Sequence, residues 1–181
     1  SAFESFTELG IKQAVIQNPR GDKISFLNVA WFLGVIRSVV LFSIAFAFSP
    51  YIAAFYDEPL LTPMIRLGFL NILFTGAMSP SSYVFMKKMN FAPWILCQHG
   101  GGVIGVISAI ILGFYGYGAW SLVYGYVIEG VSRFILSYVV SPFLPTFTLH
   151  KEDMASLLKY AKGIFGVPVL VYLYENMDLF V

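Results

Sequence analysis

The sequence predicts an all-α protein, a polytopic transmembrane helix bundle, and three observations support this fold class. Hydrophobic residues make up 58% of the 181 residues and charged residues only 12%, whereas about 25% of the residues in soluble domains are charged. The mean hydropathy is +0.77. Long apolar runs alternate with short polar segments, and four of these runs have about the 20 residues that a helix needs to cross a bilayer.

The apolar runs predict four complete spans and a fifth that is incomplete. We place them at residues 26–48, 63–86, 93–112, 119–140 and 164–181. Ser141 and Pro142 are expected to end the fourth span, because proline cannot continue a helix. Pro80 and Pro168 lie inside spans and are expected to kink their helices. The last apolar run reaches Val181 without a polar flank, so we expect the chain to stop within a helix.

The positions of Lys and Arg predict how the spans are oriented. Three precede the first span, two follow the second and three follow the fourth: Lys12, Arg20, Lys23, Lys87, Lys88, Lys151, Lys159 and Lys162. The intervening loops at residues 49–62 and 113–118 contain neither residue type. Basic loops face the cytoplasm in membrane proteins. The first span is therefore expected to run outward.

Two segments are expected at the membrane surface. In residues 151–162, Met154, Leu157, Leu158 and Ala161 recur at helical spacing with polar residues on the other faces, which predicts an interfacial elbow helix on the cytoplasmic side. Residues 50–56 form either a shorter helix on the outer surface or a loop with apolar side chains. Residues 1–17 are partly apolar and are interpreted as the cytoplasmic end of an earlier helix.

The composition argues against several functional classes. The net charge of +1 provides no field to hold nucleic acid. Cys97 is the single cysteine, and His99 and His150 are far apart in the sequence, so we expect neither a disulfide framework nor a metal site. No Gly-x-Ser-x-Gly turn is present. We therefore predict that the protein is not an enzyme and uses no cofactor.

The glycine run at residues 100–102 is interpreted as a packing feature. No Gly-Lys-Ser or Gly-Lys-Thr follows it, so it is not a phosphate-binding loop. Gly101, Gly105 and Ala109 are spaced four apart, and small residues at this spacing let two membrane helices approach closely.

The residues most informative about function are the ionisable ones inside the spans. They are Arg37, Arg66, Glu129, Arg133, Glu175 and Asp178. Each costs roughly 2.5–3.5 kcal/mol at the centre of a membrane helix on insertion scales. We therefore expect them to face a bundle interior or a watery cavity.

The arginines and Glu129 are candidates for a substrate cavity. Glu129 and Arg133 are four residues apart and share a helix face, so they form either an ion pair that fixes packing or part of the substrate path. Arg37 lies near mid-span without an acidic residue one turn away, and its partner must come from another helix, from water or from an anionic substrate. Arg66 lies about one turn inside the outer end, where it can also reach the headgroups.

Glu175 and Asp178 are candidates for proton coupling or for the cavity. They are three residues apart in the last span, and two close carboxylates disfavour double ionisation, so one can hold a proton near neutral pH. The alternative is structural pairing with one of the arginines.

Several stretches, taken in order, resemble the Wzx-type oligosaccharide flippases of the multidrug/oligosaccharidyl-lipid/polysaccharide exporter superfamily. They cover essentially the whole chain and are Glu8-Leu9-Gly10, Ala14-Val15-Ile16-Gln17, Pro50-Tyr51-Ile52-Ala53-Ala54-Phe55-Tyr56, Pro59-Leu60, Gly116-Tyr117-Gly118-Ala119-Trp120-Ser121-Leu122-Val123, Ser141-Pro142 with Pro145, and Asn176-Met177-Asp178. In one departure, Ala92-Pro93 follows Asn90-Phe91 where the family usually has a basic residue, which argues against a lipid-headgroup contact at this loop.

The resemblance implies a parent of 12–14 helices in two six-helix lobes, with this chain running from the end of helix 2 into helix 7. Residues 1–162 would belong to the N-terminal lobe and residues 163–181 would begin the second. Such flippases use a cationic cavity and alternating access to move undecaprenyl-diphosphate-linked oligosaccharide from the cytoplasmic to the outer leaflet of the bacterial inner membrane. The glycan then serves lipopolysaccharide or exopolysaccharide biosynthesis. By position, Arg37, Arg66 and Arg133 would face the diphosphate or acidic sugars.

The partners implied by the resemblance are the lipid-linked oligosaccharide, membrane lipids, the remaining helices of the parent and the polysaccharide polymerase machinery. An alternative function is a proton- or cation-coupled multidrug antiporter of the same superfamily, which would use Glu175 and Asp178. Three arginines favour an anionic substrate, whereas two free carboxylates favour a cation. A membrane glycosyltransferase or ligase would need a large loop with acidic catalytic residues, and the loops here are too short.

Overall fold

The computed structural model describes residues 11–146 and 151–164, with side chains described as far as residue 157. Within these residues the regular structure is helical, which confirms the all-α prediction. Residues 11–17 form a helical segment. The helices that follow are α2 (Ile24–Phe55), α3 (Leu61–Gly68), α4 (Leu70–Gly76), α5 (Ser82–Lys87), α6 (Phe91–Phe114), α7 (Trp120–Val140) and α8 (Lys151–Ile164).

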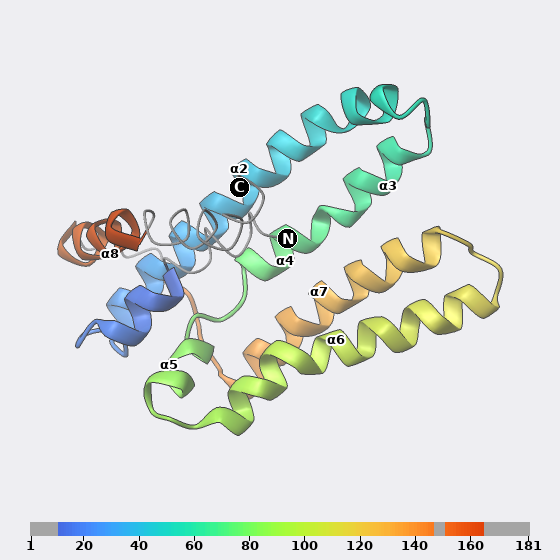
Figure 1. Ribbon diagram of the computed structural model, residues 1–181. Coiled ribbons are helices and arrows are strands. Elements are labelled where there is room, and N and C mark those ends of the chain that lie inside the picture. The colour runs from blue at the N-terminus through green and yellow to red at the C-terminus, as the bar shows by residue number, and fades with distance from the viewer. Residues whose placement is uncertain (1–10, 147–150, 165–181) are drawn as a thin grey trace, which may run out of the picture.

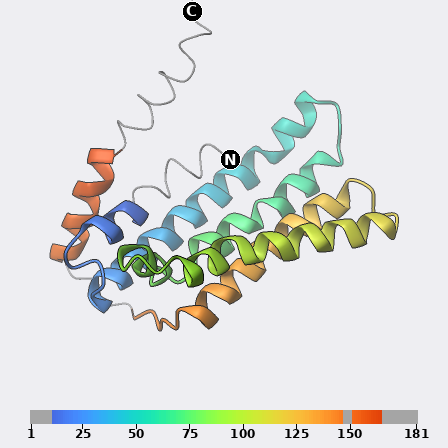
Figure 2. The same ribbon diagram turned by 60° about the horizontal axis from the view of Figure 1, so that its bottom comes forward.

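The long helices form two antiparallel hairpins that lie side by side (Figure 1). Helix α2 packs along α3 and α4, and α6 packs along α7. The hairpins meet where α3 and α4 contact α7. The loops at the tips of both hairpins lie at one end of the molecule, and α5, α8 and the start of α2 lie at the other, as the rotated view also shows (Figure 2).

Three of the described helices, α2, α6 and α7, are long and apolar enough to cross a membrane. Their outward faces carry large apolar side chains, among them Val40, Ile44, Val106 and Ile107, which are exposed to between 50% and 59%. Exposing so much apolar surface is unfavourable in water but not in the hydrocarbon of a bilayer. The fold is a transmembrane helix bundle.

The second predicted span is not one continuous helix. The helical stretch from Leu61 ends at Gly76, and at 1.5 Å per residue these 16 residues extend only about 24 Å. Residues 77–81 are not helical, and Pro80 lies in this break. Pro80 therefore interrupts the helix, where the sequence predicted only a kink. The helix also begins earlier than predicted, at Leu61.

Helix α2 is longer than the predicted first span. It runs for 32 residues and contains Pro50, so residues 50–55 continue the helix and are neither a separate surface helix nor a loop. The chain turns at Asp57, which has a φ of 53°. Aromatic side chains gather at this end of the hairpins, with Phe55 82%, Tyr56 63% and Tyr115 79% exposed, as expected at a membrane boundary.

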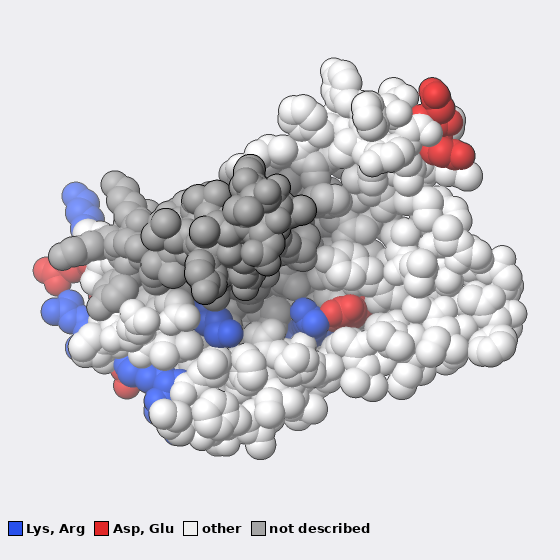
Figure 3. All heavy atoms as spheres, in the orientation of Figure 1, with Lys and Arg blue, Asp and Glu red and all other residues white. Residues whose placement is uncertain are grey.

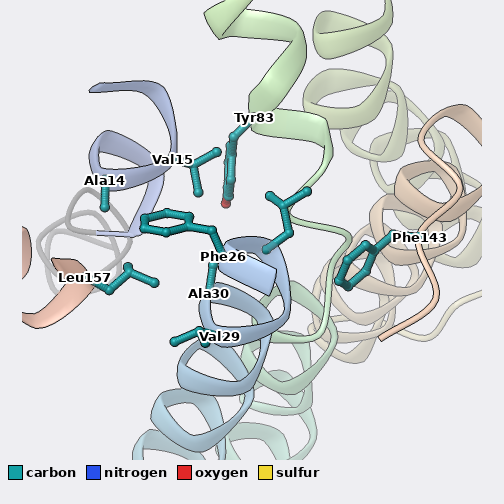
Figure 4. Packing of buried hydrophobic residues seen from close by; sticks show 9 residues of the cluster. Ala14, Val15, Phe26, Val29, Ala30, Tyr83, Phe143 and Leu157 are labelled. Atoms are coloured by element: carbon teal, nitrogen blue, oxygen red, sulfur yellow. The ribbon is translucent and has the colours of Figure 1, made fainter. Parts of the chain in front are cut away.

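A buried apolar cluster lies at the other end and joins α8 to the start of α2 (Figure 4). Leu157 of α8 is 1% exposed and packs with Val15 and Phe26. Met154 packs against the same cluster. The predicted helix at residues 151–162 therefore forms, but Met154 and Leu157 of its apolar face contact protein. The side chains of Leu158 and Ala161 lie outside the described residues.

Polar contacts hold the same end together. Lys87 Nζ donates to the carbonyl oxygens of Asn18 at 2.8 Å and Pro19 at 3.2 Å, and it lies 3.4 Å from the Asp22 carboxylate. Arg20 forms an exposed ion pair with Glu152 of α8 at 3.4 Å. A hydrogen bond from its own backbone amide, followed by the charge of Lys87, lowers the pKa of the Asp22 carboxyl below its ordinary value.

Most of the described charges lie at the ends of the helices. On the face shown in Figure 3, Lys and Arg atoms cluster where α2 begins and α8 lies, and only acidic atoms mark the tip of the α2–α3 hairpin. That tip contains Asp57 and Glu58. The described basic loops thus share one end of the bundle, as the alternation in the sequence predicted.

Candidate functional site

Arg37 lies near the middle of α2 and is partly buried. Its Nε and Nη1 atoms are shielded from solvent and have no hydrogen-bond partner among the described residues. No Asp or Glu occurs anywhere in α2, so the helix itself cannot supply a counter-ion. Donor groups buried without an acceptor are costly. Arg37 therefore stays a candidate for binding an anionic group.

Glu129 and Arg133 are paired on one face of α7. Arg133 Nη2 lies 2.5 Å from Glu129 Oε1, and the two side chains are 29% and 21% exposed respectively. The sequence left open an ion pair or a role in the substrate path, and the structure contains the ion pair. Arg133 Nε is also buried without a partner among the described residues, so this arginine retains one unsatisfied donor.

The pair lies over a track of glycines that joins α6 to α7. A Cβ atom on Gly101 would come within 2.4 Å of Arg133 Cγ, and one on Gly105 within 2.6 Å of Glu129 Cβ. On α7, a Cβ atom on Gly125 would come within 2.6 Å of Ala109 Cβ. The predicted close approach at Gly101, Gly105 and Ala109 is confirmed. The two backbones approach closely because glycine has no side chain. The Glu129–Arg133 ion pair therefore lies at the contact between α6 and α7, which we call the α6–α7 seam.

Arg66 is held against α2. Its Nε donates to Ser49 Oγ at 2.9 Å, and its guanidinium carbon stands 4.1 Å from the centre of the Phe46 ring. An open hollow of about 360 Å³ adjoins it, lined mainly by apolar side chains such as Phe42 and Leu70. The hydrogen bond and the cation–π contact stabilise the charge in an apolar place.

Two polar features between the hairpins were not recognised in the sequence. Asn71 of α4 is 3% exposed and donates to the Tyr126 carbonyl of α7 at 2.7 Å. Its Oδ1 is buried without a hydrogen-bond partner in the described part of the chain and lies against Gly130, where an added Cβ atom would collide with it. A lone asparagine in an apolar run was the available signal, because buried polar groups in membranes mark helix contacts or function.

The second feature is the break at residues 77–81, where side chains of α2 and α7 bond the Ala77 carbonyl and the Ser79 amide. Trp31 Nε1 and Tyr138 Oη donate to the Ala77 carbonyl at 3.1 and 3.0 Å. The Ser79 amide donates to Ser137 Oγ at 3.1 Å, and Ser79 Oγ donates to the Ser141 carbonyl at 2.9 Å. Irregular backbone inside a membrane is tolerated only with such partners.

The candidate site residues predicted from the sequence do not all lie together in the described structure. Glu129 and Arg133 contact each other, Arg66 contacts α2 near its outer end, and Arg37 stands alone among the described residues. Glu175 and Asp178 lie outside the described residues, so their proposed roles stay predictions. In the described part of the chain, no group of three or more His, Cys, Asp or Glu side chains could hold a metal ion.

Comparisons with known proteins agree with the resemblance drawn from the motifs. A family model described as polysaccharide biosynthesis protein matches residues 1–181. The chain is also 23% identical over 124 residues to the succinoglycan biosynthesis transport protein ExoT of Rhizobium meliloti (strain 1021). The match covers 67% of this chain and 24% of that protein, about a quarter of the relative's length.

No solved structure matches the chain. The two matches confirm the likeness to Wzx-type flippases. Because the family model extends over every residue of a transmembrane helix bundle, the chain belongs to the polysaccharide biosynthesis protein family.

Proposed function

We propose that the chain is part of a membrane transporter that flips undecaprenyl-diphosphate-linked oligosaccharide from the cytoplasmic to the outer leaflet of the bacterial inner membrane. Family membership and the transport role in the relative's name support a transporter of polysaccharide precursors. The names of the family and of the relative point to a transporter rather than an enzyme. The three apolar helices support a multi-pass membrane protein.

The main support for the proposal is that two buried nitrogens of Arg37 have no hydrogen-bond acceptor among the described residues. A diphosphate needs cationic hydrogen-bond donors, and a guanidinium group offers a planar fork that matches phosphate oxygens. In the described residues Arg37 has neither an acidic neighbour nor an acceptor for Nε and Nη1. An anionic substrate bound beside α2 would supply both a counter-ion and hydrogen-bond acceptors for Arg37.

The packing of the hairpins supports alternating access. Close contacts at Gly105 join α6 to α7, and Gly76 on α4 lies so near α2 that a Cβ atom would come within 2.3 Å of Ser38 Cβ. Closely packed helix contacts of this kind are rigid. In the proposed cycle, this lobe therefore rocks as a unit against the other lobe of the transporter.

The test is glycan export by full-length protein that carries Arg37→Ala. We expect export to be abolished at an unchanged protein level, with lipid-linked oligosaccharide accumulating on the cytoplasmic side. Arg37→Lys should recover part of the export, because it restores the charge without the planar fork. Lys88→Ala is the control, since Lys88 is an exposed cation at the basic end. Unaltered export in Arg37→Ala would remove this residue from the site.

The antiporter alternative predicts a different phenotype. It depends on Glu175 and Asp178, and their replacement by Gln and Asn should abolish proton-coupled efflux of small cations while glycan export persists. Loss of glycan export without any efflux activity would favour the flippase.

A further inference from the structure

A charged hollow of about 450 Å³ lies at the basic end of the molecule, outside the candidate substrate path. It is lined by residues from the turn before α2, the first turn of α2 and the first turn of α8, namely Arg20, Lys23, Ser25, Lys151, Glu152 and Asp153. Its size falls within the roughly 300–1,000 Å³ typical of small-ligand sites. Figure 3 shows basic and acidic atoms together at this end.

Asp153 is the unusual member of this lining. It is only 5% exposed, yet it forms no hydrogen bond or ion pair with another described residue. Its place in the first turn of α8 gives the carboxylate a favourable helix dipole. The residue is largely buried but lines the hollow, so a ligand there that carries a cationic hydrogen-bond donor would stabilise the carboxylate further.

The rim of the hollow carries positively charged side chains, opposite in charge to Asp153. Arg20, Lys23 and Lys151 are exposed, and among the described residues Arg20 pairs with Glu152 at 3.4 Å. No side-chain ion pair joins Lys23 or Lys151 to another described residue, so in this part of the chain both ammonium groups can receive an anion. The hollow thus presents a buried anionic group beside exposed cationic groups, and the complementary ligand is a zwitterion with a phosphate and a primary ammonium.

The position in the membrane identifies the source of that ligand. The hollow adjoins the first residues of α2, which is one of the membrane-spanning helices. Ile24, between the lining residues Lys23 and Ser25, is 68% exposed, which suits contact with acyl chains. The hollow therefore lies where lipid headgroups are.

We propose that this hollow binds the phosphoethanolamine headgroup of a membrane phospholipid, with its phosphate on Lys23 and Lys151 and its ammonium on Asp153. The site holds a resident lipid and does not depend on the proposed transport function. Phosphatidylcholine, whose quaternary ammonium has no N–H donor, should bind less well. Phosphatidylglycerol should use the lysines without Asp153.

The test is lipid competition on the purified full-length protein in detergent micelles, with bound lipids counted by native mass spectrometry. We expect phosphatidylethanolamine to be retained over phosphatidylcholine by about tenfold or more, the factor that one charged hydrogen bond provides. Asp153→Asn should bring that ratio close to one and leave phosphatidylglycerol retention unchanged. Replacing both Lys23 and Lys151 by Gln should weaken the retention of all three lipids.

Matched controls are Asp57→Asn, an exposed acid at the opposite end, and Lys88→Gln, a basic-end lysine that does not line the hollow. Neither should change the ratios. Because each ratio is measured within one variant, a change in overall stability does not affect it. A ratio near one in the unmodified protein, or an unchanged ratio in Asp153→Asn, would overturn the proposal.

Discussion

Two arginines inside the bundle are in different electrostatic situations. Arg133 has its counter-ion four residues away on α7, whereas Arg37 has none among the described residues. A paired arginine contributes mainly to packing, because its charge is already neutralised. An unpaired arginine remains available to a ligand, and this contrast makes Arg37 the stronger candidate for substrate binding.

Removal of Glu129 should destabilise the protein more than removal of an exposed acid. Glu129→Ala leaves Arg133 without its counter-ion, which costs roughly 3–5 kcal/mol for a fully buried pair and less at the partial exposure found here. The measurement is thermal unfolding of the full-length protein in detergent.

Glu152→Ala is the matched control, because Glu152 pairs with Arg20 at 3.4 Å and its side chain is 85% exposed. Exposed pairs contribute about 0–1 kcal/mol. Equal losses in the two variants would show that the Glu129 pair has no special structural role.

At the scale of elements, the α6–α7 hairpin depends on glycine where the backbones touch. Gly105→Ala should destabilise the hairpin by roughly 1–3 kcal/mol, because the new Cβ atom would meet Glu129 Cβ at 2.6 Å and the Gly125 carbonyl oxygen at 2.8 Å. Gly113→Ala on the same helix is the control, since its nearest neighbour would be Ser121 Oγ at 3.8 Å. Thermal unfolding that ranks the two variants in the reverse order would contradict this account of the seam.

The break at residues 77–81 contains a backbone amide that is bonded by a serine side chain of α7. Ser137→Ala removes the acceptor of the Ser79 amide, a buried bond of 3.1 Å. An unsatisfied buried donor costs about 1–3 kcal/mol. Ser43→Ala serves as the control, because that hydroxyl is exposed and bonds only within α2, to Val39.

Hydrogen exchange of the segment from residue 77 to 82 measures the effect of Ser137→Ala locally. We expect faster exchange at the Ser79 amide in this variant and unchanged exchange in Ser43→Ala. Full protection of Ser79 after the loss of Ser137 Oγ would mean that another group satisfies the amide.

At the scale of the whole molecule, the two ends of the bundle should lie on opposite sides of the membrane. In a background without other cysteines, a membrane-impermeant thiol reagent should label Glu58→Cys in intact cells and Lys88→Cys only after permeabilisation. The reason is that the basic loops favour the cytoplasm. Labelling of both variants from outside would contradict the transmembrane arrangement.

The sequence predicted best what depends on composition and local spacing. The helical class followed from apolar runs, the Glu129–Arg133 contact from a spacing of four residues, and the α6–α7 seam from Gly101, Gly105 and Ala109. It predicted the break at Pro80 poorly, because proline inside a helix allows either a kink or an interruption. The outcome depended on Trp31, Ser137 and Tyr138, which are distant in the sequence.

The sequence also could not show which ionisable residues have partners across helices. Arg66 finds Ser49 and Phe46 on α2, and Asn71 finds the Tyr126 carbonyl on α7. Neither contact follows a helical spacing, since each joins residues on different helices.

By itself, the sequence determined that hydrocarbon is the solvent of this chain, how many charges lie within its spans and which loops share a sign. These properties are sums over neighbouring residues, so they need no knowledge of contacts. Only the tertiary structure decided that the second span breaks near Pro80 and that Asp153 is buried beside exposed lysines. It also decided that, within the described residues, Arg133 has a counter-ion and Arg37 has none. The physical reason is that burial and pairing depend on which helix faces meet.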